Sequence, residues 1–126
     1  MTYFHAVVWT DHQHAQVLQF DREHVEGHKV KAHLTQTRQH GSQVRAEHDF
    51  FSELCDALRG ITEVVVTGSN TSLADFRHYV EKHRPAVSKQ VVGWETVDHP
   101  TDGQLVAFAR QYFDRYDRLA HTGNVN

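Results

Sequence analysis

Apolar and polar positions alternate along the first quarter of the chain, the pattern of strands that bury one face. Residues 3–9 (YFHAVVW) and 15–20 (AQVLQF) show it, and both are rich in aromatic and β-branched side chains. The short polar link between them predicts an antiparallel hairpin. A second polar turn over residues 21–27 leads to another alternating segment at 28–34, which we interpret as a third strand.

The pattern changes in the middle of the chain. Residues 35–45 (TQTRQHGSQVR) carry almost no apolar side chain and predict a mobile loop. Residues 46–59 have helical periodicity, and Gly60 ends that helix. Residues 61–67 (ITEVVVT) are a short apolar run typical of a buried central strand. The inner face of the helix at residues 46–59 would consist of Phe50, Phe51, Leu54, Cys55 and Leu58.

The last part of the chain predicts two more helices around one strand. Ser72 and Asp75 have the spacing of a helix start, and that helix runs to about His83 before Pro85 stops it. Residues 87–94 (VSKQVVGW) predict a strand, and residues 101–119 predict the closing helix. Its inner face would consist of Leu105, Phe108, Ala109, Tyr112, Phe113 and Tyr116.

The predicted order is β-β-β-α-β-α-β-α, which indicates the α/β class. Three meandering strands precede strands that alternate with helices, and such alternation favours parallel pairing. We therefore expect a five-stranded mixed sheet flanked by helices. The length fits one domain over residues 1–120, followed by a flexible tail at 121–126.

Composition narrows the functional classes. The single Cys55 excludes an internal disulfide and a cysteine-based zinc site, and its place beside Leu54 and Leu58 favours a core position. The start of the chain lacks the pattern of a signal peptide, and no apolar run approaches the length of a membrane span, so we expect a cytoplasmic protein. The net charge of −3 is unlike that of a dedicated nucleic-acid binder, although protonation of the 12 histidines would reverse its sign.

Two short stretches concentrate polar chemistry. In residues 97–104 (VDHPTDGQ), Thr101 and Gln104 form a capping box, and Asp102 suits the positive end of the helix dipole. Helix initiation does not explain Asp98 and His99, which follow a predicted strand at the edge where open α/β sheets bind ligands.

The second stretch is the hairpin link. Asp11, His12 and His14 could hold a divalent metal together with His33 or His99, and the alternative is that they are solvated turn residues. We expect no other cofactor.

One segment resembles a known family. Residues 61–94 are similar to the second half of the middle domain of archaeal and eukaryotic peptide release factors and of their ribosome-rescue relative Pelota, with Asp75, Phe76 and Tyr79 at matching spacing. Small bacterial proteins of the translational machinery component type resemble the chain at residues 8–12 and 98–104. The resemblance implies a ribonuclease-H-like fold.

The same resemblance bears on activity. Release factors carry Gly-Gly-Gln in the loop before the first long helix, and His40, Gly41, Ser42 and Gln43 occupy that position here. A serine in place of the second glycine restricts the backbone, which argues against release activity and leaves Gln43 as the one catalytic residue that the resemblance carries over. The resemblance therefore implies a non-enzymatic module that binds the ribosome or RNA. Its binding residues would be His40, Gly41, Ser42, Gln43, Asp98, His99 and Asp102.

The fold also suggests an alternative, a metal-dependent hydrolase or nuclease. Ribonuclease-H enzymes hold two metals on a carboxylate cluster, to which Asp11, Glu47 or Asp49, and Asp102 could contribute. The strand that ends at Gly68 offers no carboxylate, which argues against this alternative. An exposed edge strand would also permit a homodimer.

Overall fold

Residues 4–32 and 40–123 are described by the computed structural model of the chain. They form one five-stranded sheet with the order β3-β2-β1-β4-β5. The pairs β1–β2 and β2–β3 are antiparallel, whereas β1–β4 and β4–β5 are parallel. The predicted mixed sheet is thereby confirmed. The strands are β1 (His5–Thr10), β2 (His14–Phe20), β3 (Val25–Lys31), β4 (Glu63–Gly68) and β5 (Val91–Thr96).

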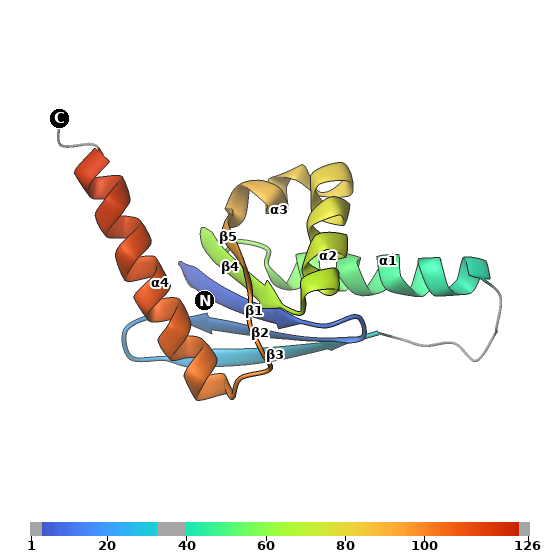
Figure 1. The fold of residues 1–126 in the computed structure, drawn as a ribbon, viewed down its shortest axis with the longest axis horizontal. Helices are drawn as coiled ribbons and strands as arrows, with labels where there is room; N and C mark the ends of the chain where they lie inside the picture. The colour runs from blue at the N-terminus through green and yellow to red at the C-terminus, as the bar shows by residue number, and fades with distance from the viewer. Residues whose placement is uncertain (1–3, 33–39, 124–126) are drawn as a thin grey trace.

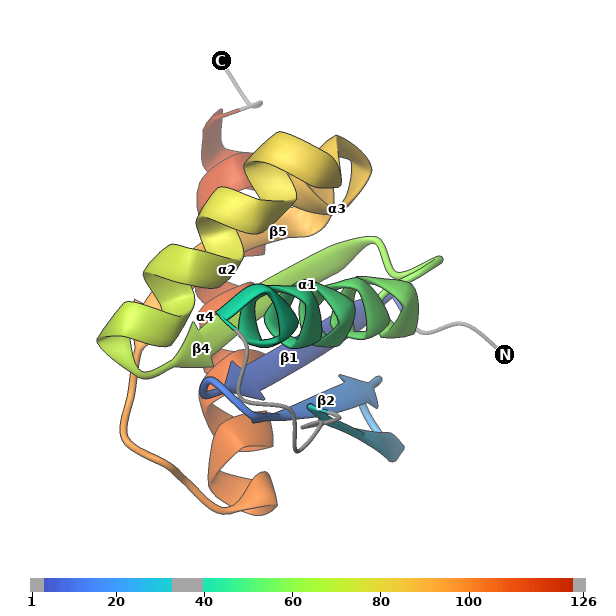
Figure 2. The same cartoon turned by 90° about the vertical axis from the view of Figure 1, so that its right-hand side faces the viewer.

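Helices cover both faces of this sheet (Figure 1). In Figure 2, α1 and α2 lie in front of the strands and α4 lies behind them. Alternate residues of each strand point to opposite faces, so the central strands must be apolar on both. Val8 of β1 belongs to a buried cluster that includes Leu54 of α1 and Phe76 of α2, called here the α1–α2 cluster. Val7 belongs to a buried cluster on the other face that includes Phe113 of α4, called here the α4 cluster. The helices are α1 (His40–Ala57), α2 (Asn70–His83), α3 (Pro85–Gln90) and α4 (Asp102–Gly123).

Two predicted boundaries near the amino terminus are wrong. The third strand begins at Val25 rather than at residue 28, because the Asp21 carboxylate accepts hydrogen bonds from the backbone N–H of Glu23 and His24 and closes the turn early. Helix α1 begins at His40, inside the segment predicted as a loop. Its first turns extend beyond the sheet (Figure 1), where no apolar face is needed and hydrophobic periodicity therefore gives no signal. Residues 33–39 of that segment lie outside the described part.

Pro85 begins a helix as well as following one. Residues 85–90, of which the last four were predicted as strand, form α3 with the proline in its first turn, where proline is well tolerated. Val87 of α3 is buried in the α1–α2 cluster. The Gln90 side chain donates hydrogen bonds to the carbonyls of Leu58 and Ile61, which anchors the end of α3 to the loop after α1.

The sequence predicted the start of α4 correctly but not the start of α2. Helix α2 starts at Asn70 after Ser69, and Ser72 is buried in its first turn instead of capping it. For α4 the capping box is confirmed. The Thr101 N–H donates to Gln104 Oε1 at 3.0 Å, and the Gln104 N–H donates to Thr101 Oγ1 at 3.2 Å.

Helix α4 continues beyond its predicted end, to Gly123. Leu105, Ala109 and Phe113 of its predicted inner face are buried, whereas Tyr116 is 37% exposed. Among the helices of the described residues, none has the length and apolar character needed to cross a membrane.

Candidate functional site

The parallel strands β1, β4 and β5 end at the same edge of the sheet, called here the carboxyl edge. The β1–β2 turn with Asp11 and His12 follows β1, helix α2 follows β4, and the segment with Asp98 and His99 follows β5. This is the edge where open α/β sheets bind ligands. The fold therefore places these predicted site residues in the expected region, and the contacts of each show what it does there.

Asp11 and His14 shape the β1–β2 turn. Asp11 Oδ1 accepts hydrogen bonds from the backbone N–H of Gln13 at 2.8 Å and of His14 at 2.6 Å. The same oxygen lies 3.6 Å from His14 Nδ1. The carboxylate thus replaces backbone partners in the turn, which is a common use of aspartate at such positions.

His12 points instead toward α2. Its Nε2 lies 3.1 Å from Thr71 Oγ1, and its Nδ1 lies 3.9 Å from Asp75 Oδ2. Glu47 of α1 joins this pair, and the ligand atoms of all three side chains lie within 4.8 Å of one another. The grouping of these three was missed from the sequence, because turn, α1 and α2 are distant along the chain and no spacing rule connects them.

The segment before α4 is used for packing and attachment. The His99 ring stacks on the Trp9 ring, with centroids 4.0 Å apart and an interplanar angle of 15°. Asp102 Oδ2 accepts a hydrogen bond from Gln16 Nε2 at 3.2 Å, which ties the start of α4 to β2. Asp98 is exposed.

The predicted metal and nuclease sets are not brought together by these contacts. Among the described residues, two groups of three metal-ligating side chains have mutually close ligand atoms, and neither contains Asp11, His14, His99 or Asp102. His33 lies outside the described residues. The backbone of residues 40–43 forms the first turn of α1.

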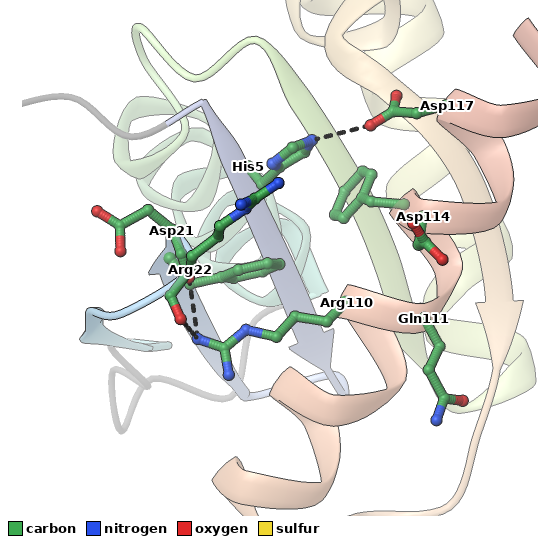
Figure 3. Close-up of a pocket in the computed structure, with 9 residues that line it drawn as sticks. His5, Asp21, Arg22, Arg110, Gln111, Asp114 and Asp117 are labelled. Carbon is green, nitrogen blue, oxygen red and sulfur yellow. Dashed lines mark hydrogen bonds and ion pairs between the residues drawn. The ribbon is translucent and has the colours of Figure 1, made fainter. Parts of the chain in front are cut away.

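A pocket of about 610 Å³ opens at the opposite edge of the sheet, between the start of β1, the end of β2 and α4 (Figure 3). Aromatic rings form part of its wall, with the ring centroids of His5 and Phe113 4.3 Å apart. Arg110 donates a hydrogen bond to the Asp21 carbonyl at 2.9 Å, and its guanidinium lies over the Phe20 ring. The lining residues are His5, Phe20, Asp21, Arg22, Arg110, Gln111, Phe113, Asp114 and Asp117.

The second group of close ligand atoms lies beside this pocket. His5 Nε2 is 2.9 Å from Glu63 Oε1 and 3.9 Å from Asp117 Oδ2. Burial and the neighbouring Asp117 carboxylate raise the pKa of Glu63, while the hydrogen bond to His5 opposes the shift. His5 and Glu63 are register partners at the first positions of β1 and β4, so cross-strand pairing explains their hydrogen-bonded contact. Sequence reasoning missed them because the register of two strands so far apart is a tertiary property.

The raised pKa of Glu63 predicts how the protein responds to pH. The folded state binds the Glu63 proton more tightly than the unfolded state does. The contribution of this group to stability is therefore present below the unfolded pKa of about 4.5 and is lost as pH rises through the raised folded pKa. We expect Glu63→Gln to gain stability relative to the unmodified protein as pH increases above about 4.5. Urea unfolding over a pH series measures the difference, with the exposed Glu23→Gln as control. A difference that stays constant with pH would contradict the assignment.

Cys55 is predicted to be unreactive in the folded protein. The side chain is buried in the α1–α2 cluster, and burial raises the pKa of its thiol to about 12. Only a thiolate attacks disulfide reagents, so at pH 8 we expect labelling by an aromatic disulfide to require unfolding. The labelling rate with and without urea checks this. Rapid stoichiometric labelling of the native protein would show that the thiol is accessible.

Comparison with known proteins gives matches in structure only. No family model matches the chain, and no curated protein matches its sequence significantly. Pelota from Archaeoglobus fulgidus matches 88% of the chain at 13% identity, with a TM-score of 0.60. Pelota from Thermoplasma acidophilum matches 81% at 15% identity and a TM-score of 0.57. The archaeal translation termination factor aRF1 matches 96% at 10% identity and a TM-score of 0.56.

These matches cover only part of the larger proteins. The chain spans 32% of the first Pelota, 30% of the second and 42% of aRF1. Identities this low establish likeness of fold and not of activity. The α/β fold and the structural relationship that the sequence indicated are confirmed: the chain has the fold of one part of Pelota and of archaeal release factor aRF1.

Proposed function

We propose that the protein is a binding domain of the translation machinery, which associates with the ribosome during termination or stress and does not hydrolyse peptidyl-tRNA. The observation that supports this is the fold match, because 96% of the chain matches a part of a translation termination factor.

The start of α1 supports the non-enzymatic half of the proposal. The resemblance places the Gly-Gly-Gln position of release factors at Gly41, Ser42 and Gln43, and these residues are in helical conformation in this chain. A regular helical turn with a serine at its centre lacks the backbone freedom of two consecutive glycines. We propose that residues 40–43, together with Asp98, His99 and Asp102, contribute to binding instead.

Sedimentation with ribosomes tests the association. We expect the protein to enter the ribosomal fractions at low salt and to leave them at high salt, because contacts to ribosomal RNA are screened. Its absence from those fractions at low salt would refute the proposal. A parallel assay of peptidyl-tRNA hydrolysis should show no activity, and hydrolysis abolished by Gln43→Ala would overturn the non-enzymatic half.

A matched pair of variants localises the binding surface. We expect the double variant His40→Ala with Gln43→Ala to reduce co-sedimentation, whereas Gln111→Ala on α4 should not. If both variants co-sediment equally, the start of α1 is not part of the binding surface, and the ribosome must bind elsewhere on the protein.

The homodimer remains a prediction. The edge strands of the sheet are β3 and β5, and β3 carries Lys29 and Lys31, charged residues of the kind that discourage edge-to-edge pairing. Sedimentation equilibrium measures the state directly, and a monomer at all concentrations would exclude the dimer.

A further inference from the structure

We propose that His12, Glu47 and Asp75 bind one divalent transition-metal ion at the carboxyl edge of the sheet. The three side chains come from the β1–β2 turn, α1 and α2, and their ligand atoms all lie within 4.8 Å of one another. The inference does not depend on ribosome association, because it rests on this geometry alone.

The chemistry of the three groups suits such an ion. Two carboxylates balance the charge of a divalent cation, and a neutral imidazole adds the nitrogen ligand that zinc, nickel and iron accept. Around an ion with bonds of about 2.1 Å, tetrahedral ligand atoms lie about 3.4 Å apart. The separation of His12 Nδ1 and Asp75 Oδ2 is already 3.9 Å. The His12 and Asp75 side chains are 47% and 51% exposed, so small rotations can close the remaining gap.

Thr71 positions the imidazole for this role. With the proton on His12 Nε2, that N–H donates to Thr71 Oγ1 at 3.1 Å, and Nδ1 keeps its lone pair on the side of Asp75. Metal-binding histidines regularly use the second ring nitrogen in such a hydrogen bond, which sets the tautomer and the ring orientation. Helix α2 therefore supplies both a ligand, Asp75, and the residue that orients another.

The ion would keep a position open to water. Glu47 and Asp75 also line a groove of about 200 Å³ between α1 and α2. Three protein ligands leave at least one coordination site free, and this groove gives a water molecule access to it. The same groove contains two other possible ligands for a metal ion, His48 and His83, whose ring centroids are 5.6 Å apart. The experiment must therefore distinguish binding at these two histidines from binding at His12, Glu47 and Asp75.

Titration of chelator-treated protein with Zn²⁺, and in parallel with Mn²⁺, tests the site. We expect one tight equivalent of Zn²⁺, and at least a tenfold loss of affinity in each of His12→Ala, Glu47→Gln and Asp75→Asn. Thr71→Val keeps every ligand but removes the orienting hydrogen bond, so its affinity should fall about tenfold. Circular dichroism of each variant controls for folding. His12, Thr71 and Asp75 are exposed and Glu47 is only partly buried, so we expect the fold to stay intact.

Two histidine variants serve as matched controls. His48 lies in the same groove and His14 closes the same turn. The variants His48→Ala and His14→Ala should therefore bind Zn²⁺ with the affinity of the unmodified protein. Anomalous scattering at the zinc edge from crystals of the unmodified protein should place the ion among His12, Glu47 and Asp75. An ion found elsewhere, affinity lost in His48→Ala but not in His12→Ala, or no binding of either metal would overturn the proposal.

Discussion

Replacing Phe76 by alanine is expected to lower the free energy of unfolding by about 3–5 kcal/mol, the usual cost of removing a buried phenylalanine side chain. Phe76 is fully buried on α2. Its ring centroid lies 5.3 Å from that of Phe51 on α1 and 5.9 Å from that of Trp94 on β5. The cavity would therefore open where α1, α2 and the sheet meet.

Urea unfolding and thermal melting measure this effect. For a domain of this size the loss corresponds to a fall in melting temperature on the order of 10–20 °C. Phe4→Ala is the matched control, because Phe4 is 53% exposed and its removal should change stability by less than about 0.5 kcal/mol. A loss below about 1 kcal/mol in Phe76→Ala would mean that the α1–α2 cluster is not packed as described.

Gly68→Ala is expected to lower the free energy of unfolding by about 3 kcal/mol, which is the upper end of the usual cost of overpacking an interior site. Gly68 ends β4 opposite Thr10 at the end of β1, and an added Cβ would lie 2.1 Å from the Thr10 carbonyl oxygen. That oxygen belongs to the backbone, so the two central strands would have to separate. Because the β1–β2 turn with His12 begins there, the variant should also weaken metal binding at the proposed site.

Gly103→Ala is expected to raise the free energy of unfolding, in contrast to Gly68→Ala. A Cβ at Gly103 meets no atom within 4 Å, and alanine costs less backbone entropy than glycine in the first turn of α4. Stability should therefore rise, by up to about 1 kcal/mol. Chemical denaturation of the two variants side by side checks both predictions. Equal effects of the two substitutions would contradict the close approach of β4 to β1 at Gly68.

Elements whose signals are local could be predicted from the amino-acid sequence. Alternating apolar residues predicted the hairpin of β1 and β2, because burial of one face imposes a period of two on a strand. Thr101 and Gln104 predicted the start of α4, since both partners of a capping box lie within one turn. The place of Cys55 among apolar helix positions predicted its burial. These elements also sufficed for the fold class, because the order of strands and helices limits the topologies available.

The meeting of distant segments became visible only in the folded chain. The start of α1 has no apolar stripe to reveal it. Helix α3 forms where Val87 packs in the α1–α2 cluster and Gln90 bonds to the loop after α1. His12, Glu47 and Asp75 come together because a turn and two helices converge at the carboxyl edge. Each such contact depends on how whole elements pack and in what register. A pattern read along one segment contains no information about the side chains that another segment brings to it.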